Sequence, residues 1–198
     1  MLAVAEKDAQ GLTGAMRSIE RAFLVGVEGA TEVLLVRHGD CYEAMESSDD
    51  PPLSRLGEEQ AKRLGRRLRK LELDAVYSSP LRRARQTAEA ITPDYAIEPR
   101  LLEATTNLED GRVEVAESPD QITQRMRAAV DEAVAAHAGG RVVMVGHAMS
   151  ILAYLCDVLR VEFGSLRLLP YYTSINVVRV LADRRMVGAL ADTAHLEG

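Results

Sequence analysis

The sequence predicts an α/β fold, a three-layer α/β/α sandwich built around a largely parallel sheet. Short apolar runs such as Val33–Val36 and Val142–Val145 are typical of strands that are buried on both faces. Segments with helical spacing of apolar residues alternate with these runs along the chain. The 198 residues, 47% of them hydrophobic and 27% charged, suit one globular domain with an appendage.

The first 30 residues differ from the rest and are interpreted as an N-terminal extension. Met16, Ile19, Ala22 and Phe23 recur at helical spacing, which predicts an amphipathic helix over residues 13–23. A basic stretch followed by an apolar segment is not found there, so we expect no signal peptide and a cytoplasmic protein. The main domain is expected to cover residues 31–198.

The first half of the domain is predicted to run strand, helix, strand, helix. The first strand covers residues 32–36. The following helix, Arg55–Leu71, has Ser54 as its expected N-cap, and a strand at Asp74–Tyr77 comes next. We expect Ser79 to cap the second helix, with proline at its first position.

The second half repeats these signals. Ser118 and the proline after it open a helix whose buried stripe includes Ile122 and Met126, and Gly139 ends it. The remaining predicted elements are a strand at Val142–Val145, a helix at Ser150–Leu159, and two strands at Ile175–Leu181 and Met186–Ala191.

Two histidines occupy the same structural setting. His38 and His147 each come directly after a predicted buried strand. In open α/β sheets the ligand crevice lies beyond the carboxyl ends of the strands, so the two imidazoles are expected to face each other across a bound group. One histidine alone is more often a surface or core residue, but two in equivalent positions favour a functional site.

Arginines accompany both the first histidine and the second helix. Arg37 adjoins His38, and Arg82, Arg83 and Arg85 lie near the start of the helix that Ser79 is expected to open. Guanidinium groups aimed at one point suit a phosphate dianion, because each can donate two hydrogen bonds to its oxygens. A solvated helix face explains Arg82 and Arg85, which leaves Arg83 as the candidate phosphate ligand.

Together these segments resemble the histidine phosphatase superfamily, also called phosphoglycerate-mutase-like, over roughly residues 31–181. Each block alone is weak, but their order and spacing are specific. The blocks that carry the resemblance are Arg37-His38-Gly39, then Pro52-Leu53-Ser54 with Gly57 and Gln60-Ala61, then Ser79 to Thr87, and finally Val145-Gly146-His147.

The resemblance implies a phosphoric monoester hydrolase of the histidine acid phosphatase type, acting through a phosphohistidine intermediate. His38 would be the nucleophile, and Arg37, Arg83 and His147 would hold the phosphoryl oxygens. The implied substrate is a small-molecule phosphate ester.

A carboxylic acid is needed to protonate the leaving oxygen. In the mutase-like branch of the family it lies in a Leu-x-Glu or similar segment after the second helix, and Glu103 matches that segment. Glu109 and Asp110 are the alternatives.

Three other functions are weighed: a phosphoglycerate mutase, a protein phosphohistidine phosphatase and a non-catalytic phospho-ligand-binding domain. The mutase-like branch has an asparagine where this chain has Ala44, and the interval between Glu103 and His147 is short for the superfamily. Both departures favour an open phosphatase cleft, which also suits a protein substrate. The intact histidine and arginine set argues against a binding domain without catalysis.

Charge and composition limit the expected partners. The net charge of −6 argues against a nucleic-acid binder that relies on broad basic electrostatics, and the basic run Lys62–Lys70 is interpreted as a solvated helix face. Apolar runs are far shorter than the roughly 20 residues of a membrane span. We expect neither metal nor cofactor, because no cluster has metal-ligand spacing and arginines supply positive charge. The oligomeric state is open, with a homodimer as one option.

Overall fold

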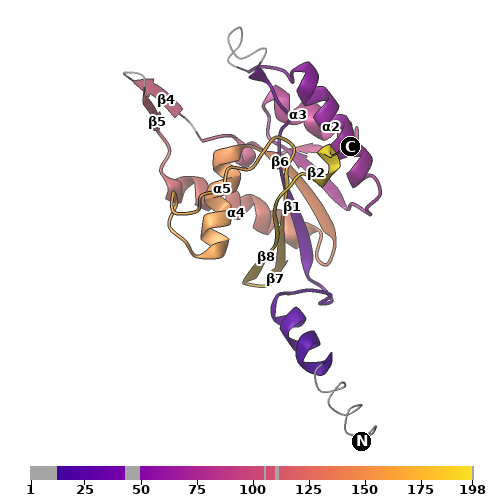
Figure 1. Ribbon diagram of the computed structural model, residues 1–198. Coiled ribbons are helices and arrows are strands. Elements are labelled where there is room, and N and C mark those ends of the chain that lie inside the picture. The colour runs from indigo at the N-terminus through magenta and orange to yellow at the C-terminus, as the bar shows by residue number, and fades with distance from the viewer. Residues whose placement is uncertain (1–12, 43–49, 105, 110–111, 198) are drawn as a thin grey trace, which may run out of the picture.

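The computed structural model describes residues 13–42, 50–104, 106–109 and 112–197 (Figure 1). For residues 106–109 and 112–115 it describes the backbone only. Six strands form a mixed sheet in the order β3-β2-β6-β1-β7-β8. The strands are β1 at Thr31–Arg37, β2 at Ala75–Ser78, β3 at Ala96–Ile97, β6 at Arg141–Gly146, β7 at Ile175–Leu181 and β8 at Arg184–Asp192.

The sheet is parallel at its centre and antiparallel at one edge. Strand β1 pairs in parallel with β6, β6 with β2, and β2 with β3. On the other side of β1, strand β7 runs antiparallel to β1, and β8 runs antiparallel to β7. Only Ala182 and Asp183 join β7 to β8, and a connection this short permits a hairpin but no parallel crossover. The predicted largely parallel sheet is thus confirmed for its central strands.

Helices cover both faces of the sheet, as the three-layer prediction requires. In Figure 1, α2 (Arg55–Leu68) and α3 (Arg82–Ile91) lie on one side of the sheet, and α4 (Pro119–Ala136) and α5 (Ala148–Leu159) lie on the other.

Alternate residues of the central strands enter two separate cores. Val33 and Leu35 of β1 pack in the core with α4 and α5, whereas Leu34 and Val36 pack with α2 and α3. All four are at most 4% exposed. Since a fully buried aliphatic side chain contributes about 1.5–3 kcal/mol, this two-sided burial explains the continuous apolar run in the sequence.

Two predicted helix starts are confirmed in detail. The Ser54 hydroxyl accepts a hydrogen bond from the Gly57 amide at 3.0 Å, which caps α2. Ser118 and Gln121 form a reciprocal capping box at the start of α4. Helix α2 ends at Leu68, three residues sooner than predicted.

The predicted N-cap at Ser79 is wrong. Helix α3 begins at Arg82, and the carboxylate of Asp50 accepts a hydrogen bond from the Arg82 amide at 2.8 Å. The Ser79 amide instead donates to the carbonyl of Val145 in β6, which extends the sheet pairing by one residue. Its hydroxyl accepts a hydrogen bond from the amide of Leu81, the residue before α3, at 3.4 Å, but it caps no amide within the helix.

The poorly patterned middle of the sequence contains elements that periodicity did not predict. They are β3, a 3₁₀ turn η2 at Pro99–Leu101, and the antiparallel pair β4 (Thr106–Glu109) and β5 (Arg112–Val115). The β4–β5 hairpin projects away from the domain (Figure 1). Short elements of two to four residues carry too little periodicity to be recognised.

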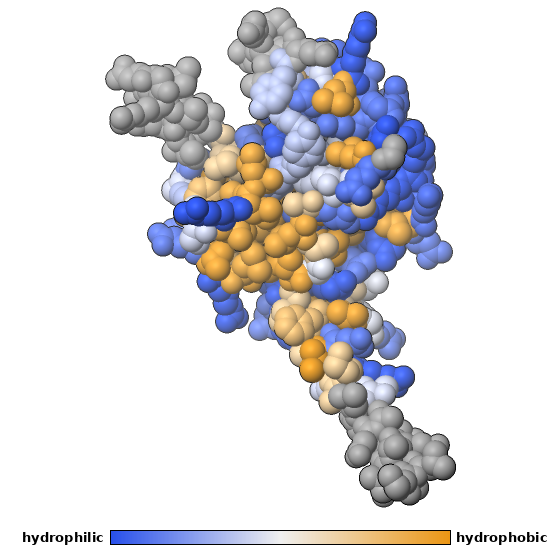
Figure 2. Space-filling model, in the orientation of Figure 1, coloured by the Kyte–Doolittle hydropathy of each residue, from blue (hydrophilic) through white to orange (hydrophobic). Residues whose placement is uncertain are grey.

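Residues 13–22 form a helix within the predicted range, and this helix extends away from the domain (Figure 1). Met16, Ile19 and Phe23 are each at least 51% exposed, so the apolar face does not pack against the sheet domain. Leu24, only 1% exposed, anchors the base of the extension. Figure 2 shows apolar surface along this segment and over α5. None of the helices in the described part of the chain has the length and hydropathy that crossing a bilayer requires.

Candidate active site

The two histidines lie together at the carboxyl ends of adjacent parallel strands. His38 follows β1, His147 follows β6, and the His38 amide donates to the carbonyl of Gly146 at 3.0 Å. The ring centroids are 5.0 Å apart, and the two residues are 5% and 0% exposed. The expected placement of both imidazoles at one site is found.

The hydrogen bonds of His38 determine which ring nitrogen is available for chemistry. Nδ1 lies 2.6 Å from the carbonyl oxygen of Gly39, so Nδ1 carries the proton and donates a hydrogen bond to that oxygen. Nε2 accepts a hydrogen bond from Nε of Arg83 at 3.2 Å and holds a lone pair. Burial, followed by the charge of Arg83, lowers the pKa of His38 to about 3. The ring is thus neutral near pH 7, as a nucleophile must be.

The two arginines approach this histidine from different elements. Arg83 comes from the first turn of α3, and Arg37 is the last residue of β1. The Arg37 guanidinium stacks on the ring of Tyr172 at 3.9 Å and donates through Nη1 to the carbonyl of Pro170 at 2.8 Å. Among the described residues its Nε has no hydrogen-bond partner although it is buried. This guanidinium therefore keeps one unused donor, its Nε, in the residue that precedes His38.

His147 is positioned by a serine from the neighbouring strand. Nε2 of His147 lies 2.8 Å from the hydroxyl of Ser79, which follows β2. Its Nδ1 is buried and without a partner in the described part of the chain. Burial, then the proximity of His38 and Arg83, lowers the pKa of His147 well below its ordinary value. When Ser79 donates to Nε2, Nδ1 carries the proton and is a free donor beside the His38 ring.

The loop after His38 is braced by residues of the other sequence blocks. The Gly39 amide donates to the hydroxyl of Thr87 at 3.0 Å, and the Asp40 amide donates to the side chain of Gln60 at 2.9 Å. The Ser54 hydroxyl donates to the Asp40 carboxylate at 2.6 Å. These contacts give Gln60, Ser54 and Thr87 a structural role, since they hold the loop that orients the histidine.

The predicted general acid, Glu103, lies at the start of α5. Its carboxylate accepts hydrogen bonds from the amides of Met149 and Ser150, both at 3.2 Å, and from its neighbour Ala104 at 2.9 Å. An anion at a helix N-terminus is stabilised by these free amides. Helix α5 begins directly after His147, so Glu103 is held near that histidine.

The side chains of the other two acid candidates lie outside the described part of the structure. Glu109 belongs to β4, and its side chain lies outside the described part of the structure. Asp110 also lies outside the described residues. The choice among the three carboxylates therefore stays a prediction.

Several residues of the site were missed or left without a role by the sequence reasoning. Tyr172 is 7% exposed and packs against both Arg37 and the ring of His38, whose centroid is 5.8 Å away. The Thr173 amide donates to the carbonyls of Arg37 and His38. Ser79 could have been found by the rule that identified the histidines, because it too follows a parallel strand.

The site combines two fixed cations with two neutral imidazoles. Such a set has the chemistry to bind a phosphoryl dianion and to offer it one unprotonated nitrogen. Within the described residues, no three His, Cys, Asp or Glu side chains gather where they could hold a metal ion.

Comparison with known proteins identifies similar sequences. The sequence model of the histidine phosphatase superfamily (branch 1) matches residues 33–114 and 102–193. A relative from Erwinia tasmaniensis, named probable phosphoglycerate mutase GpmB, is 27% identical over 205 residues, and the match covers 84% of this chain and 95% of that protein.

Solved structures share the fold. Bacillus stearothermophilus YhfR superposes with a TM-score of 0.71 at 26% identity, covering 84% of this chain and 100% of that one. A mycobacterial glucosyl-3-phosphoglycerate phosphatase superposes with a TM-score of 0.68 at 22% identity, covering 81% of this chain and 98% of that one. The overall fold is thus common to these proteins.

Proposed function

The chain belongs to the histidine phosphatase superfamily, a family of phosphatases and mutases, and we propose that it hydrolyses phosphate monoesters through a phosphoryl group on Nε2 of His38. One observation carries the proposal. His38 is buried and neutral, with its Nδ1 proton committed to the Gly39 carbonyl and its Nε2 lone pair beside Arg83. A phosphoryl group bound by Arg83 meets that lone pair directly.

The first step is phosphorylation of the enzyme. Nε2 of His38 attacks phosphorus in line, the N–P bond forms, and the bond from phosphorus to the ester oxygen breaks. Arg37, Arg83 and the Nδ1–H of His147 hold the equatorial oxygens and stabilise the charge of the transition state. A protonated Glu103 gives its proton to the leaving oxygen, so the alcohol departs neutral.

The second step returns the enzyme to its starting state. The Glu103 carboxylate takes a proton from a water molecule, and the water oxygen attacks phosphorus. The N–P bond breaks, its electron pair returns to Nε2 of His38, and inorganic phosphate leaves. No metal is needed in either step, because the two guanidinium groups supply the positive charge.

A phosphoglycerate mutase is the second candidate function, favoured by the name of the Erwinia relative. A mutase must hold its phosphoenzyme until the second substrate oxygen attacks in place of water. The alignment has 205 positions yet covers only 84% of the 198 residues here, so this chain is the shorter one over the matched region. A shorter chain has less material to enclose the substrate, which favours hydrolysis.

The substrate class proposed is a small-molecule phosphate ester. The mycobacterial neighbour is a phosphatase for a phosphorylated small molecule by its name, and the proposed cleft needs only one phosphoryl site. A phosphohistidine-bearing protein is the alternative substrate, and a panel of phospho-metabolites and one phosphohistidine protein separates the two.

The mechanism is tested with a variant of the proposed nucleophile and with a matched pair of arginine variants. His38→Ala should abolish turnover and the acid-labile phosphate that wild type incorporates from labelled substrate. Arg83→Ala should lower kcat/KM by about 10²–10³-fold, whereas Arg85→Ala, an exposed neighbour on α3, should change it less than about twofold. Turnover by His38→Ala within tenfold of wild type would falsify the mechanism.

Metal independence is tested separately. Activity should survive exhaustive dialysis against a chelator, because arginines take the place of a cation at the phosphoryl group. If activity disappears with the chelator and returns with a divalent ion, the proposed arginine clamp is wrong.

A further inference from the structure

A second cationic site lies on the far side of α2 from the sheet. Five basic side chains line a groove of about 700 Å³ between α2 and the C-terminal turn η3 (Ala194–Leu196). Its other lining residues are Ala194 and His195, so within the part of the chain that the structure describes no acidic side chain lines it. Figure 1 shows η3 lying beside α2. The basic residues are Arg63, Arg66, Arg67, Arg69 and Lys70.

The groove exists because the chain end packs against the outer face of α2. Leu64 and Leu68 turn inward to the core, which leaves the basic residues on the opposite side. Nη1 of Arg63 donates to the carbonyl of Leu196 at 3.1 Å, and Arg67 makes a two-pronged ion pair with Asp192. These contacts hold η3 in place as one wall of the groove. The basic residues of α2 therefore line a concave surface and not only a flat, solvated helix face.

Carboxylates neutralise only part of this charge. Glu59 is the acidic partner of both Arg63 and Arg66, at 3.1 and 3.6 Å, and Asp192 is the partner of Arg67. Arg69 and Lys70 form no ion pair within the described residues, although Arg69 donates to the carbonyl of Ala90. Among the described residues, the ion pairs of these five cations involve two carboxylates, in a chain whose net charge is −6. Such a local excess raises the concentration of anions at the groove.

We propose that this groove binds a small molecule that carries two or more linked phosphate groups, at a site separate from His38. Residues 63, 66 and 67 belong to the C-terminal half of α2, and Lys70 follows in the turn that continues it, so the row spans about 10 Å at roughly 1.5 Å per residue. A single phosphate is too small to contact both ends of that row, but a polyphosphate chain reaches along it and suits guanidinium forks.

The position on α2 makes the two sites distinct. Gly57, in the first turn of α2, contacts the loop after His38, whereas the basic row belongs to the C-terminal half and the residues just beyond it. The row is also short, and the acidic charge elsewhere on the chain disfavours a long nucleic acid.

The test is calorimetric titration of the full-length chain with inorganic tripolyphosphate. The His38→Ala background prevents turnover, so the result is independent of the proposed phosphatase activity. Adding Arg66→Ser and Lys70→Ser should weaken tripolyphosphate binding by about tenfold or more.

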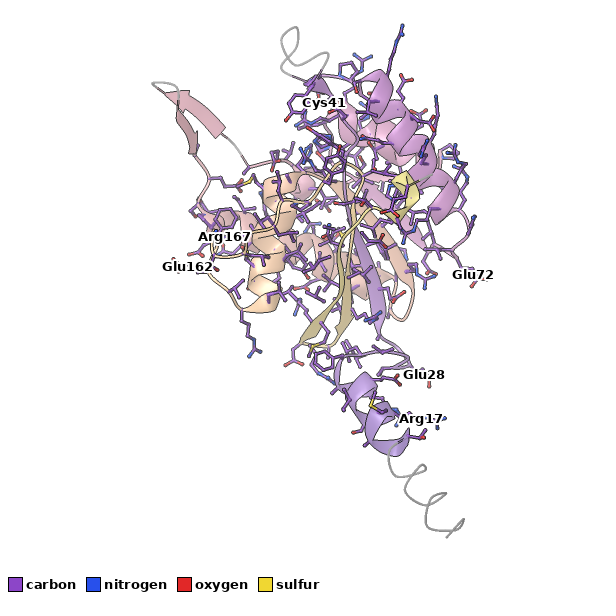
Figure 3. The ribbon with its side chains drawn as sticks, viewed as in Figure 1. Arg17, Glu28, Cys41, Glu72, Glu162 and Arg167 are labelled. Atoms are coloured by element: carbon purple, nitrogen blue, oxygen red, sulfur yellow. The ribbon has the colours of Figure 1, made fainter. Side chains whose placement is uncertain are left out.

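The control removes the same charge elsewhere. Arg17→Ser with Arg167→Ser should change the dissociation constant less than about twofold. Both residues are exposed, one on the N-terminal helix and one in the segment after α5 (Figure 3). Equal weakening by the two double variants would mean that only net charge matters, and the site would be rejected.

Backbone amide NMR shifts locate the ligand. Tripolyphosphate should shift the signals of residues 63–70 and 194–196, and inorganic phosphate should bind at least about tenfold more weakly there. Shifts confined to the surroundings of Arg83 and His147 would overturn the proposal. So would tighter binding of a single-stranded oligonucleotide than of tripolyphosphate, because it would point to a nucleic-acid surface.

Discussion

At the scale of single residues, backbone groups hold the predicted nucleophile and the predicted general acid in opposite ways. The Gly39 carbonyl accepts a hydrogen bond from Nδ1–H of His38, which leaves Nε2 unprotonated. The amides of Met149 and Ser150 bind the carboxylate of Glu103. The lone pair of His38 is what attack on phosphorus needs, whereas the proposed role of Glu103 is to give a proton in the first step and to take one in the second. That double role makes Glu103 the most informative residue to test.

Replacing Glu103 by glutamine keeps an oxygen that can accept the amide hydrogen bonds of α5 but removes the transferable proton. Glu103→Gln should slow hydrolysis of an alkyl phosphate by about 10²–10⁴-fold, because an alkoxide leaves poorly without a proton. With an aryl phosphate, the rate of the phosphorylation step should fall less, because a phenolate leaves with little need of a proton. Steady-state and burst kinetics on both substrates measure the difference.

The exposed Glu89 on α3 supplies the control, and Glu89→Gln should leave both rates unchanged. Equal losses on the two substrates would assign Glu103 a positioning role. No loss on either would move the acid to Glu109 or Asp110.

At the scale of elements, the start of α2 and the loop after β1 can pack this closely only because Gly57 and Gly39 have no Cβ. A Cβ on Gly57 would lie 2.0 Å from the carbonyl oxygen of Asp40, and a Cβ on Gly39 would lie 2.7 Å from the carbonyl oxygen of Gly57. Both obstacles are backbone atoms, so neither relaxes without moving the loop. The Gly57 of the second sequence block thus serves the position of His38 through close packing.

Gly57→Ala should therefore destabilise the fold by about 2–3 kcal/mol and lower kcat/KM, because the loop carrying His38 must shift. Urea denaturation and steady-state kinetics measure the two effects. Gly14→Ala, on the N-terminal helix with open space around it, should change neither. Wild-type stability in the Gly57 variant would show that the loop adapts without cost.

At the scale of the whole molecule, buried neutral histidines make stability depend on pH. Burial is the main cause that lowers the pKa of His38 to about 3 and of His195 to about 4, and it lowers the pKa of His147 as well. In the unfolded chain these imidazoles titrate near 6.5. Between these values the unfolded state binds more protons than the folded one. Their contribution to stability is complete above pH 6.5 and is lost as the pH falls towards 3–4.

The free energy of unfolding should fall by about 1.4 kcal/mol per pH unit for each deeply buried histidine below pH 6.5. Urea midpoints at about pH 7.5, 6 and 5 measure the slope, and His38→Ala should make it shallower. The Arg67–Asp192 pair does not contribute in this window, since the pKa of Asp192 is lowered to about 2 by its hydrogen bonds with Arg67. A flat profile, or the wild-type slope in His38→Ala, contradicts this account.

The order and type of the main elements could be predicted from the sequence because their signals are local. Apolar runs identified β1 and β6, and the serine signals located the starts of α2 and α4. The position of His38 and His147 after two such strands was enough to expect them at one site, since parallel strands end at the same edge of a sheet. The homodimer and the boundary at residue 30 stay predictions.

What only the tertiary structure decided depends on contacts between residues far apart in the chain. The partner of Ser79 is a histidine 68 positions away, and the cap of α3 comes from Asp50, 32 positions before it. The contact of the Ser79 hydroxyl with the Leu81 amide is local, whereas its contact with His147 exists only because the packed sheet brings the ends of β2 and β6 together. Likewise the tautomer of His38 and the groove beside α2 arise when the Gly39 carbonyl and the chain end are brought into place by folding.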